Sequence, residues 1–176
     1  MTDTSGREPW IWIVFGVAVL EIVLSLTWNR TYFTVGVPIF RRDLVMGQPG
    51  PAMPTPERLE KAMSKSVFPA FAFRALENNL LGFRERARSR SLRFHYTPVM
   101  HGNLLFEASH ARLRVTGLTN WFTVAFLVFG IASSVMFERS LVLVFLVVLY
   151  GGIYFIQARR FRGVSRDAAK EWMTSR

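Results

Sequence analysis

The chain has 176 residues, a formal net charge of +10 and 51% hydrophobic residues, and it contains no cysteine. The absence of cysteine excludes disulfides, thiolate metal sites, iron–sulfur clusters and a cysteine nucleophile. A chain of this length has room for one modest folded unit beside membrane segments, but not for two full domains.

The first apolar run extends from Trp10 to Trp28 and follows eight polar residues that carry no positive cluster. At 1.5 Å per residue, such a run reaches about 28 Å, close to the thickness of a bilayer's hydrocarbon core. It is also too long for a typical signal-peptide core. We therefore predict an extracytoplasmic N-terminus at 1–8 and a transmembrane helix over 9–28. Trp10 and Trp12 would anchor it at one membrane interface and Trp28 at the other.

Residues 29–120 form short alternating segments broken by glycine, proline and asparagine, a pattern that predicts a β-rich domain. After a proline-rich connection, Thr55, Pro56 and Glu57 begin a short helix that extends to about Ser66. The predicted strands cover residues 31–37, 39–45, 70–76, 81–87, 92–96, 103–108 and 112–116. We expect an antiparallel sheet or partly closed barrel of five to seven strands with one helix, an architecture that pleckstrin-like domains also have.

A second apolar stretch extends from Trp121 to Ile156 and is interrupted only by Glu138, Arg139 and Ser140. It predicts a transmembrane hairpin with helices over 121–137 and 140–157, and Trp121 as a further interface anchor. Residues 158–176 are basic and could form an amphipathic helix on the membrane surface with Trp172 and Met173. The expected fold class is thus an α+β membrane protein, in which three transmembrane helices flank a small antiparallel cytoplasmic domain.

The distribution of charge predicts the topology. Residues 29–120 contain 14 Lys and Arg against 6 Asp and Glu, and residues 157–176 contain 6 against 2. Because positive segments stay in the cytoplasm, both regions should be cytoplasmic, with the hairpin turn and the N-terminus outside. We expect a multi-pass protein of an inner (cytoplasmic) membrane.

Glu21 is an acidic residue that the first predicted helix places near the middle of the membrane. An ionisable group there costs about 3 kcal/mol and is a functional hypothesis by default. Ala18 and Ser25 share its helix face, and Tyr150 in the third helix falls at a similar depth. We predict a hydrogen bond from Tyr150 to Glu21, with Gly151 and Gly152 allowing the helices to approach. A bond from Glu21 to a partner's helix is a second structural interpretation, and proton or ion transfer through Glu21 is the alternative to both.

Small and polar residues recur at helical spacing in the hairpin. Thr123, Leu127, Gly130 and Ser134 form one such stripe, and Tyr150, Gly151 and Tyr154 form another. Each stripe predicts a packing face, either between the helices of this chain or against a partner.

Eight arginines predict a surface for anionic lipid or for an acidic partner, worth about 1 kcal/mol per charge near a membrane. They are Arg84, Arg86, Arg88, Arg90, Arg93, Arg159, Arg160 and Arg162. Nucleic acid attracts the same side chains, but tethering to the membrane favours lipid or protein. A solvated sheet edge is the simplest alternative.

Neither a catalytic motif nor a metal-binding pattern is present in the sequence. His95, His101 and His110 lack the spacing of metal ligands, and no nucleophile elbow, phosphate loop or carboxylate pair occurs. Because the membrane runs contain no histidine, we expect no cofactor bound by this chain alone, although lipid, quinone or pigment could contact its helix faces.

These features predict a non-catalytic accessory subunit of a larger integral membrane complex, with energy-transducing complexes, photosynthetic or respiratory, as the first guess for the host. A membrane-anchored pleckstrin-like module that binds lipid or peptide is the alternative. A proton- or ion-coupled membrane protein that uses Glu21 is the third hypothesis.

Overall fold

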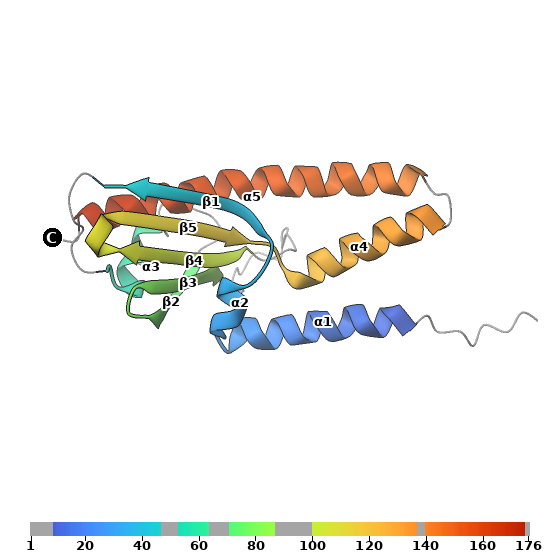
Figure 1. Cartoon of the computed structure of the whole chain (residues 1–176), viewed down its shortest axis with the longest axis horizontal. Helices are drawn as coiled ribbons and strands as arrows, with labels where there is room; N and C mark the ends of the chain where they lie inside the picture. Colours follow the sequence, from blue (N-terminus) through green and yellow to red (C-terminus); the bar gives the residue numbers. More distant parts are fainter. Residues whose placement is uncertain (1–8, 47–52, 64–70, 87–99, 137–139, 175–176) are drawn as a thin grey trace, which may run out of the picture.

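The computed structural model describes residues 9–46, 53–63, 71–86, 100–136 and 140–174. In these ranges, three long helices extend beside and beyond one antiparallel sheet (Figure 1). They are α1 (Pro9–Leu26), α4 (Trp121–Met136) and α5 (Ser140–Thr174). The protein is therefore α+β.

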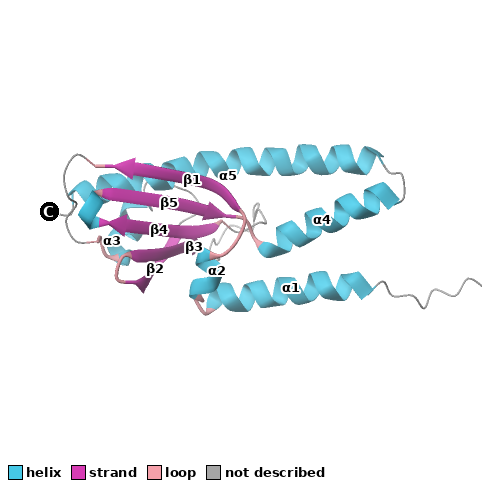
Figure 2. Ribbon diagram, viewed as in Figure 1, coloured by secondary structure: helices cyan, strands magenta, loops and turns pink. Residues whose placement is uncertain are grey.

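The described residues contain five strands in the spatial order β1-β5-β4-β3-β2, and every neighbouring pair is antiparallel (Figure 2). The strands are β1 (Pro38–Val45), β2 (Phe71–Glu77), β3 (Leu80–Glu85), β4 (His101–Glu107) and β5 (Arg112–Leu118). Strands β2 to β5 form a meander, and β1 pairs with the free edge of β5. The strands predicted near these positions are confirmed, whereas the predicted strand at 92–96 lies outside the described residues.

One face of the sheet is covered by α3 (Pro56–Met63) and by the second half of α5. Leu59 and Met63 of α3 are fully buried, as are Phe161 and Val164 of α5. The start of α3 agrees with the predicted Thr55-Pro56 signal. A Cβ atom on Gly117 of β5 would lie 2.5 Å from the Phe161 ring, so the absence of a side chain allows this close approach.

The strand predicted over residues 31–37 is wrong. Arg30–Thr34 forms a short helix, α2, and the Asn29 side chain caps it by accepting a hydrogen bond from Thr31 N at 2.9 Å. The β-branched and aromatic residues of this segment favour a strand by propensity. Burial of Tyr32 and Phe33 against the sheet, together with the cap, outweighs that preference.

The expectation of a surface helix in the basic tail is also wrong. Residues 158–174 continue α5 without a break, and Trp172 is buried against Phe106 with a ring-centroid distance of 5.3 Å. Phe161, Val164, Ala168 and Trp172 recur at helical spacing, so this face belongs to the core of the sheet domain. Helix α5 therefore connects the apolar hairpin rigidly to the domain.

Among the described helices, α5 alone is long and apolar enough to cross a membrane by length and composition, while α1 and α4 are shorter apolar helices. The prediction of three spans therefore goes further than this finding. Helix α4 lies between α1 and α5 and contacts both (Figure 1). A Cβ atom on Gly130 of α4 would lie 2.9 Å from Leu146 of α5, which places Gly130 at the α4–α5 contact.

Candidate functional site

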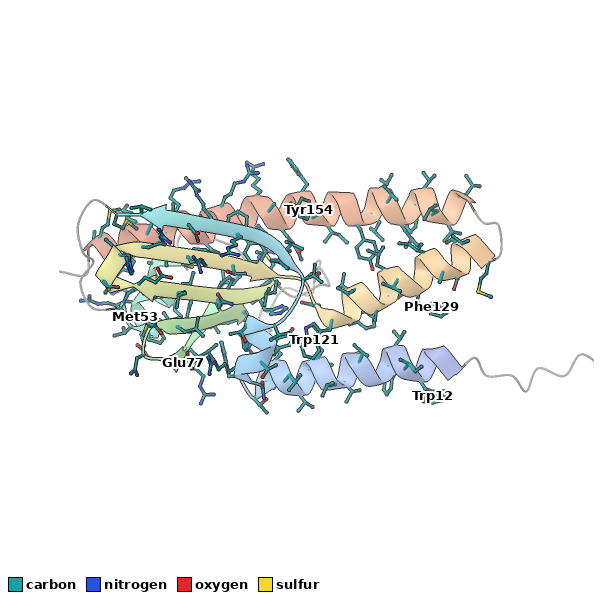
Figure 3. The ribbon with its side chains drawn as sticks, viewed as in Figure 1. Trp12, Met53, Glu77, Trp121, Phe129 and Tyr154 are labelled. Carbon is teal, nitrogen blue, oxygen red and sulfur yellow. The ribbon has the colours of Figure 1, made fainter. Side chains whose placement is uncertain are left out.

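A buried polar cluster lies where α1, α2, the sheet and α4 meet. We call it the junction cluster, and it consists of Glu21 on α1, Tyr32 on α2, His101 at the start of β4 and Asn120 before α4. All four residues are buried. Figure 3 shows the neighbouring Trp121 at the beginning of α4, beside α1 and α2.

Glu21 accepts hydrogen bonds from three donors. Its Oε1 accepts from the Tyr32 hydroxyl at 2.8 Å and from Trp121 N at 3.2 Å, and its Oε2 accepts from Phe122 N at 2.8 Å. The two amides belong to the first turn of α4, where helical N–H groups have no partner within the helix. The carboxylate of one helix therefore caps the positive end of another, which satisfies those amides and holds α1 against α4.

Asn120 occupies the N-cap position of α4, because its carbonyl accepts the first helical hydrogen bond from Val124 N. Its side-chain oxygen lies 3.0 Å from His101 Nδ1 instead of capping the helix. With this oxygen as acceptor, Nδ1 of His101 carries the proton. The capping function is thereby left to Glu21.

Tyr32 connects the two halves of the cluster. Its ring stacks on the His101 ring with a centroid distance of 4.2 Å, and its hydroxyl lies 3.4 Å from His101 Nδ1. Burial and the adjacent Glu21 carboxylate raise the pKa of Tyr32 far above its ordinary value, so the hydroxyl stays protonated and donates. Burial also lowers the pKa of Arg84, whose guanidinium lies 5.0 Å from the centre of the Trp28 ring.

We expect Tyr32→Phe to lower the free energy of unfolding by about 1–2 kcal/mol, because Glu21 Oε1 loses the Tyr32 hydroxyl as a donor and keeps the Trp121 amide. The raised pKa of Tyr32 adds a pH dependence. The stability due to the protonated hydroxyl is complete below pH 10, the ordinary pKa, and is lost as the pH rises toward the folded value. The variant should therefore lose less stability than the wild type between pH 9 and 11.

Thermal unfolding in detergent at several pH values measures both effects. Tyr154→Phe is the control, because Tyr154 is exposed on α5. If the melting temperatures of the wild type and of Tyr32→Phe fell equally as the pH rises from 9 to 11, the role given to the Tyr32 hydroxyl would be contradicted.

The hydrogen bond predicted from Tyr150 to Glu21 is wrong, because a tyrosine does donate to Glu21 but it is Tyr32. Helix α4 separates α1 from α5, and a Cβ atom on Gly151 or Gly152 would meet no described atom within 4 Å. These glycines therefore do not bring two helices of the described chain together. Glu21 also lies level with the first turn of α4 at the edge of the domain, not at the middle of the apolar helices.

The two predicted stripes differ in their surroundings. In α4, Thr123 and Ser134 are buried, Leu127 is half-buried and Gly130 faces α5. In α5, Gly151 and Tyr154 are exposed and Tyr150 is half-buried (Figure 3). The α4 stripe thus faces neighbouring helices of this chain, whereas the α5 stripe is largely exposed. On α1, Ala18 and Ser25 are half-buried beside Glu21.

The predicted arginine surface is divided. Arg86 forms an ion pair with Glu60, and Arg160 forms one with Glu85 at 2.5 Å in a largely buried position. Together with Arg84 on Trp28, these three make contacts within the chain. Arg159 and Arg162 are exposed, while Arg88, Arg90 and Arg93 lie outside the described residues.

The predicted interface tryptophans also differ. Trp12 is exposed near the start of α1, and the side chain of Trp10 is not among those described. Trp28 has a left-handed φ of 55° in the turn after α1 and stacks on Phe33 at 5.1 Å. The indole Nε1 of Trp121 donates to Val35 O at 3.3 Å. The side chains of Trp28 and Trp121 therefore make contacts with residues of the sheet domain and the segment before it.

Sequence reasoning found Glu21 but missed Tyr32, His101 and Asn120. One usable signal was Asn120, since asparagine directly before an apolar helical run is an N-cap pattern. Tyr32 was assigned to a strand without a role, and His101 was considered only as a metal ligand and rejected for its spacing. In the described part of the chain, no group of three or more His, Asp or Glu side chains could hold a metal ion. The junction cluster is suited to joining helices.

No family model, no curated protein and no solved structure matches this chain.

Proposed function

We propose that this chain is a non-catalytic, membrane-anchored accessory subunit. Its helices pack against a larger membrane assembly, and its sheet domain covers the cytoplasmic face of that assembly. The observation that carries the proposal is the large apolar surface that α1, α4 and the first half of α5 leave uncovered, beside a domain with a well-packed core of its own.

The first half of α5 is the clearest example. Leu141 is 84% exposed, and Val148 and Phe155 are each 69% exposed. On the side of this helix that faces away from α4, side chains project without a covering layer (Figure 3). Burial of such side chains is worth about 1.5–3 kcal/mol each, so an apolar environment must replace water around them. Lipid and partner helices both supply it.

Three spans with a cytoplasmic domain form the arrangement that we propose. Helices α1 and α4, with 18 and 16 residues, extend about 27 and 24 Å, and α4 packs between α1 and the apolar half of α5. The excess of Lys and Arg in residues 29–120 and 157–176 supports a cytoplasmic location for both regions.

The geometry of Glu21 favours a structural role over ion transfer. The carboxylate is buried, and its three donors are two backbone amides and a tyrosine hydroxyl. Both oxygens of this carboxylate are engaged in capping α4 and in accepting from Tyr32, which is an arrangement that joins helices. The contacts of Arg84, Arg86 and Arg160 within the chain likewise weaken the pleckstrin-like alternative, which needs free basic side chains.

Purification of a tagged chain in mild detergent, followed by mass spectrometry and an absorption spectrum, tests the proposal. We expect stoichiometric recovery of larger membrane subunits, and a coloured eluate would identify a pigment- or haem-containing host. Recovery of the chain alone or with lipid only would contradict the subunit function and favour the anchored binding module.

Gly151→Leu provides a sharper prediction for the same experiment. Apart from its chain neighbours and the backbone of its own helix, no described atom lies within 4 Å of a Cβ atom at this position, so the substitution should not lower the thermal unfolding temperature of the isolated chain. If the face of Gly151 and Tyr154 contacts a partner helix, the added side chain should reduce partner recovery at least tenfold. Val142→Leu, at an exposed site on the opposite face of the same helix, is the matched control. Unchanged recovery with Gly151→Leu would place the partner on another face.

A further inference from the structure

At the membrane-proximal end of the sheet domain, an apolar surface extends past the level at which α4 begins, from the end of α1 onto the segment before β1. Glu21 Oε2 lies 2.8 Å from Phe122 N, so Glu21 marks the level at which α4 begins. Helix α1 continues for five residues beyond this level to Leu26, about 7.5 Å toward the domain. The segment before β1 lies at the same level, since Trp121 Nε1 donates to Val35 O and Thr119 N donates to Val37 O.

Five large apolar side chains around this level are between 49% and 59% exposed. They are Ile22, Val23, Leu26, Val35 and Val37, and we call them the interfacial collar. Among the described residues outside α1, α4 and the apolar half of α5, the only other large apolar side chains that are exposed are Val45 and Met173. Both of these lie at the opposite end of the domain (Figure 1). The exposed apolar surface of α1 thus continues onto the segment before β1, at the end of the domain where the helices leave it.

Aromatic and basic residues occupy the same level. Trp28 follows α1, Trp121 is the first residue of α4, and the Arg84 guanidinium lies over the Trp28 ring. Arg159 and Arg162 are exposed on either side of Phe161, whose ring lies against Gly117 near the end of β5. Indole rings and arginines next to an apolar surface are typical of the boundary between acyl chains and phosphate headgroups.

We infer that this end of the domain is embedded in the membrane interface. The collar contacts the outer part of the acyl chains, and the neighbouring arginines contact anionic headgroups. The collar is continuous with the exposed faces of α1 and α4 and is bordered by cationic side chains, and both features fit phospholipid as the occupant. This inference rests on the proposed membrane location and adds that the domain does not stand clear of the bilayer.

The absence of cysteine makes a direct test possible, because a single introduced cysteine can carry a nitroxide label without background. Leu26→Cys and Val37→Cys probe the collar in the full chain, reconstituted in nanodiscs of phosphatidylcholine and phosphatidylglycerol. Val45→Cys, at the far end of the strand that follows Val37, reports on water, and Val147→Cys in α5 reports on the membrane. Power saturation of the nitroxide signal in the presence of oxygen, and then of a water-soluble nickel chelate, measures how accessible each site is to each reagent.

We expect the oxygen-to-nickel accessibility ratio at Leu26 and Val37 to be several-fold higher than at Val45 and lower than at Val147. Water-like ratios at both collar sites, with a lipid-like ratio at Val147, would overturn the inference and leave the membrane location intact. Shielding of the collar sites from both reagents would also overturn it, since protein would then cover the collar. A water-like ratio at Val147 would contradict the proposed function itself.

Discussion

Glu21→Ala should lower the free energy of unfolding by about 3 kcal/mol. The substitution removes the acceptor of three donors at once, namely the Tyr32 hydroxyl and the amides of Trp121 and Phe122. Each buried donor that loses its partner costs about 1–3 kcal/mol, and the amides of the first helical turn have no other acceptor within their helix. The contact between α1 and α4 should weaken with the cap.

Thermal and denaturant unfolding in detergent measures the change, and cysteine crosslinking between α1 and α4 reports the loosening. Glu21→Gln should have an intermediate effect, because the amide keeps one acceptor oxygen but places an N–H₂ group near a backbone N–H. Ser25→Ala is the matched control, one helical turn further along the same face. Wild-type stability of Glu21→Ala would show that the cap is dispensable.

The sequence contained enough information to locate most elements of the sheet. In strands β2 to β5, apolar residues either alternate with polar ones or follow one another, and turn-forming residues bound each strand. The start of α3 has a capping hydroxyl followed by proline. These signals are local, and local signals are readable from one sequence. The same reading failed at residues 31–37, because burial of Tyr32 and Phe33 against β3 and β4 is a tertiary effect that propensity does not include.

The junction cluster illustrates a second limit. Glu21 could be identified as a candidate from the sequence because it is a charged residue inside an apolar run. Its hydrogen-bond partners could not, because two of them are about a hundred residues away in the sequence. Helix depth alone suggested Tyr150, whereas the true donor, Tyr32, is only eleven residues from Glu21. That contact depends on the reversal of the chain at Trp28, where a left-handed backbone in a residue other than glycine is not evident from sequence.

The length of α5 shows how a charge pattern can conceal a core. Arg159, Arg160, Arg162 and Arg166 dominate the composition after Ile156 and suggested a polar tail. The intervening Phe161, Val164, Ala168 and Trp172 form a regular apolar face that packs on the sheet. Arginine can coexist with such a face because most of these guanidinium groups point to the solvent side of the helix.

Phe161→Ala should destabilise the domain by about 3–5 kcal/mol, the range for removal of a large aromatic side chain from a packed core. Phe161 is fully buried, stacks on Phe40 at 5.6 Å and meets Phe83 edge to face at 6.0 Å. Its ring also fills the space above Gly117, so the variant leaves a cavity between α5 and the centre of the sheet. Because α5 is a single helix, this loss also weakens the link between its apolar half and the domain.

The matched control is Phe155→Ala, which makes the same substitution six residues earlier on the same helix at a site that is 69% exposed. We expect it to change the unfolding of the isolated chain by less than about 0.5 kcal/mol. Limited proteolysis after heating should release the sheet domain from α5 in Phe161→Ala at temperatures at which Phe155→Ala stays intact. Equal effects of the two substitutions would contradict the assignment of the basic half of α5 to the core. The contrast within one helix also separates its two tasks, since the first half presents apolar surface to the outside and the second half supports the sheet.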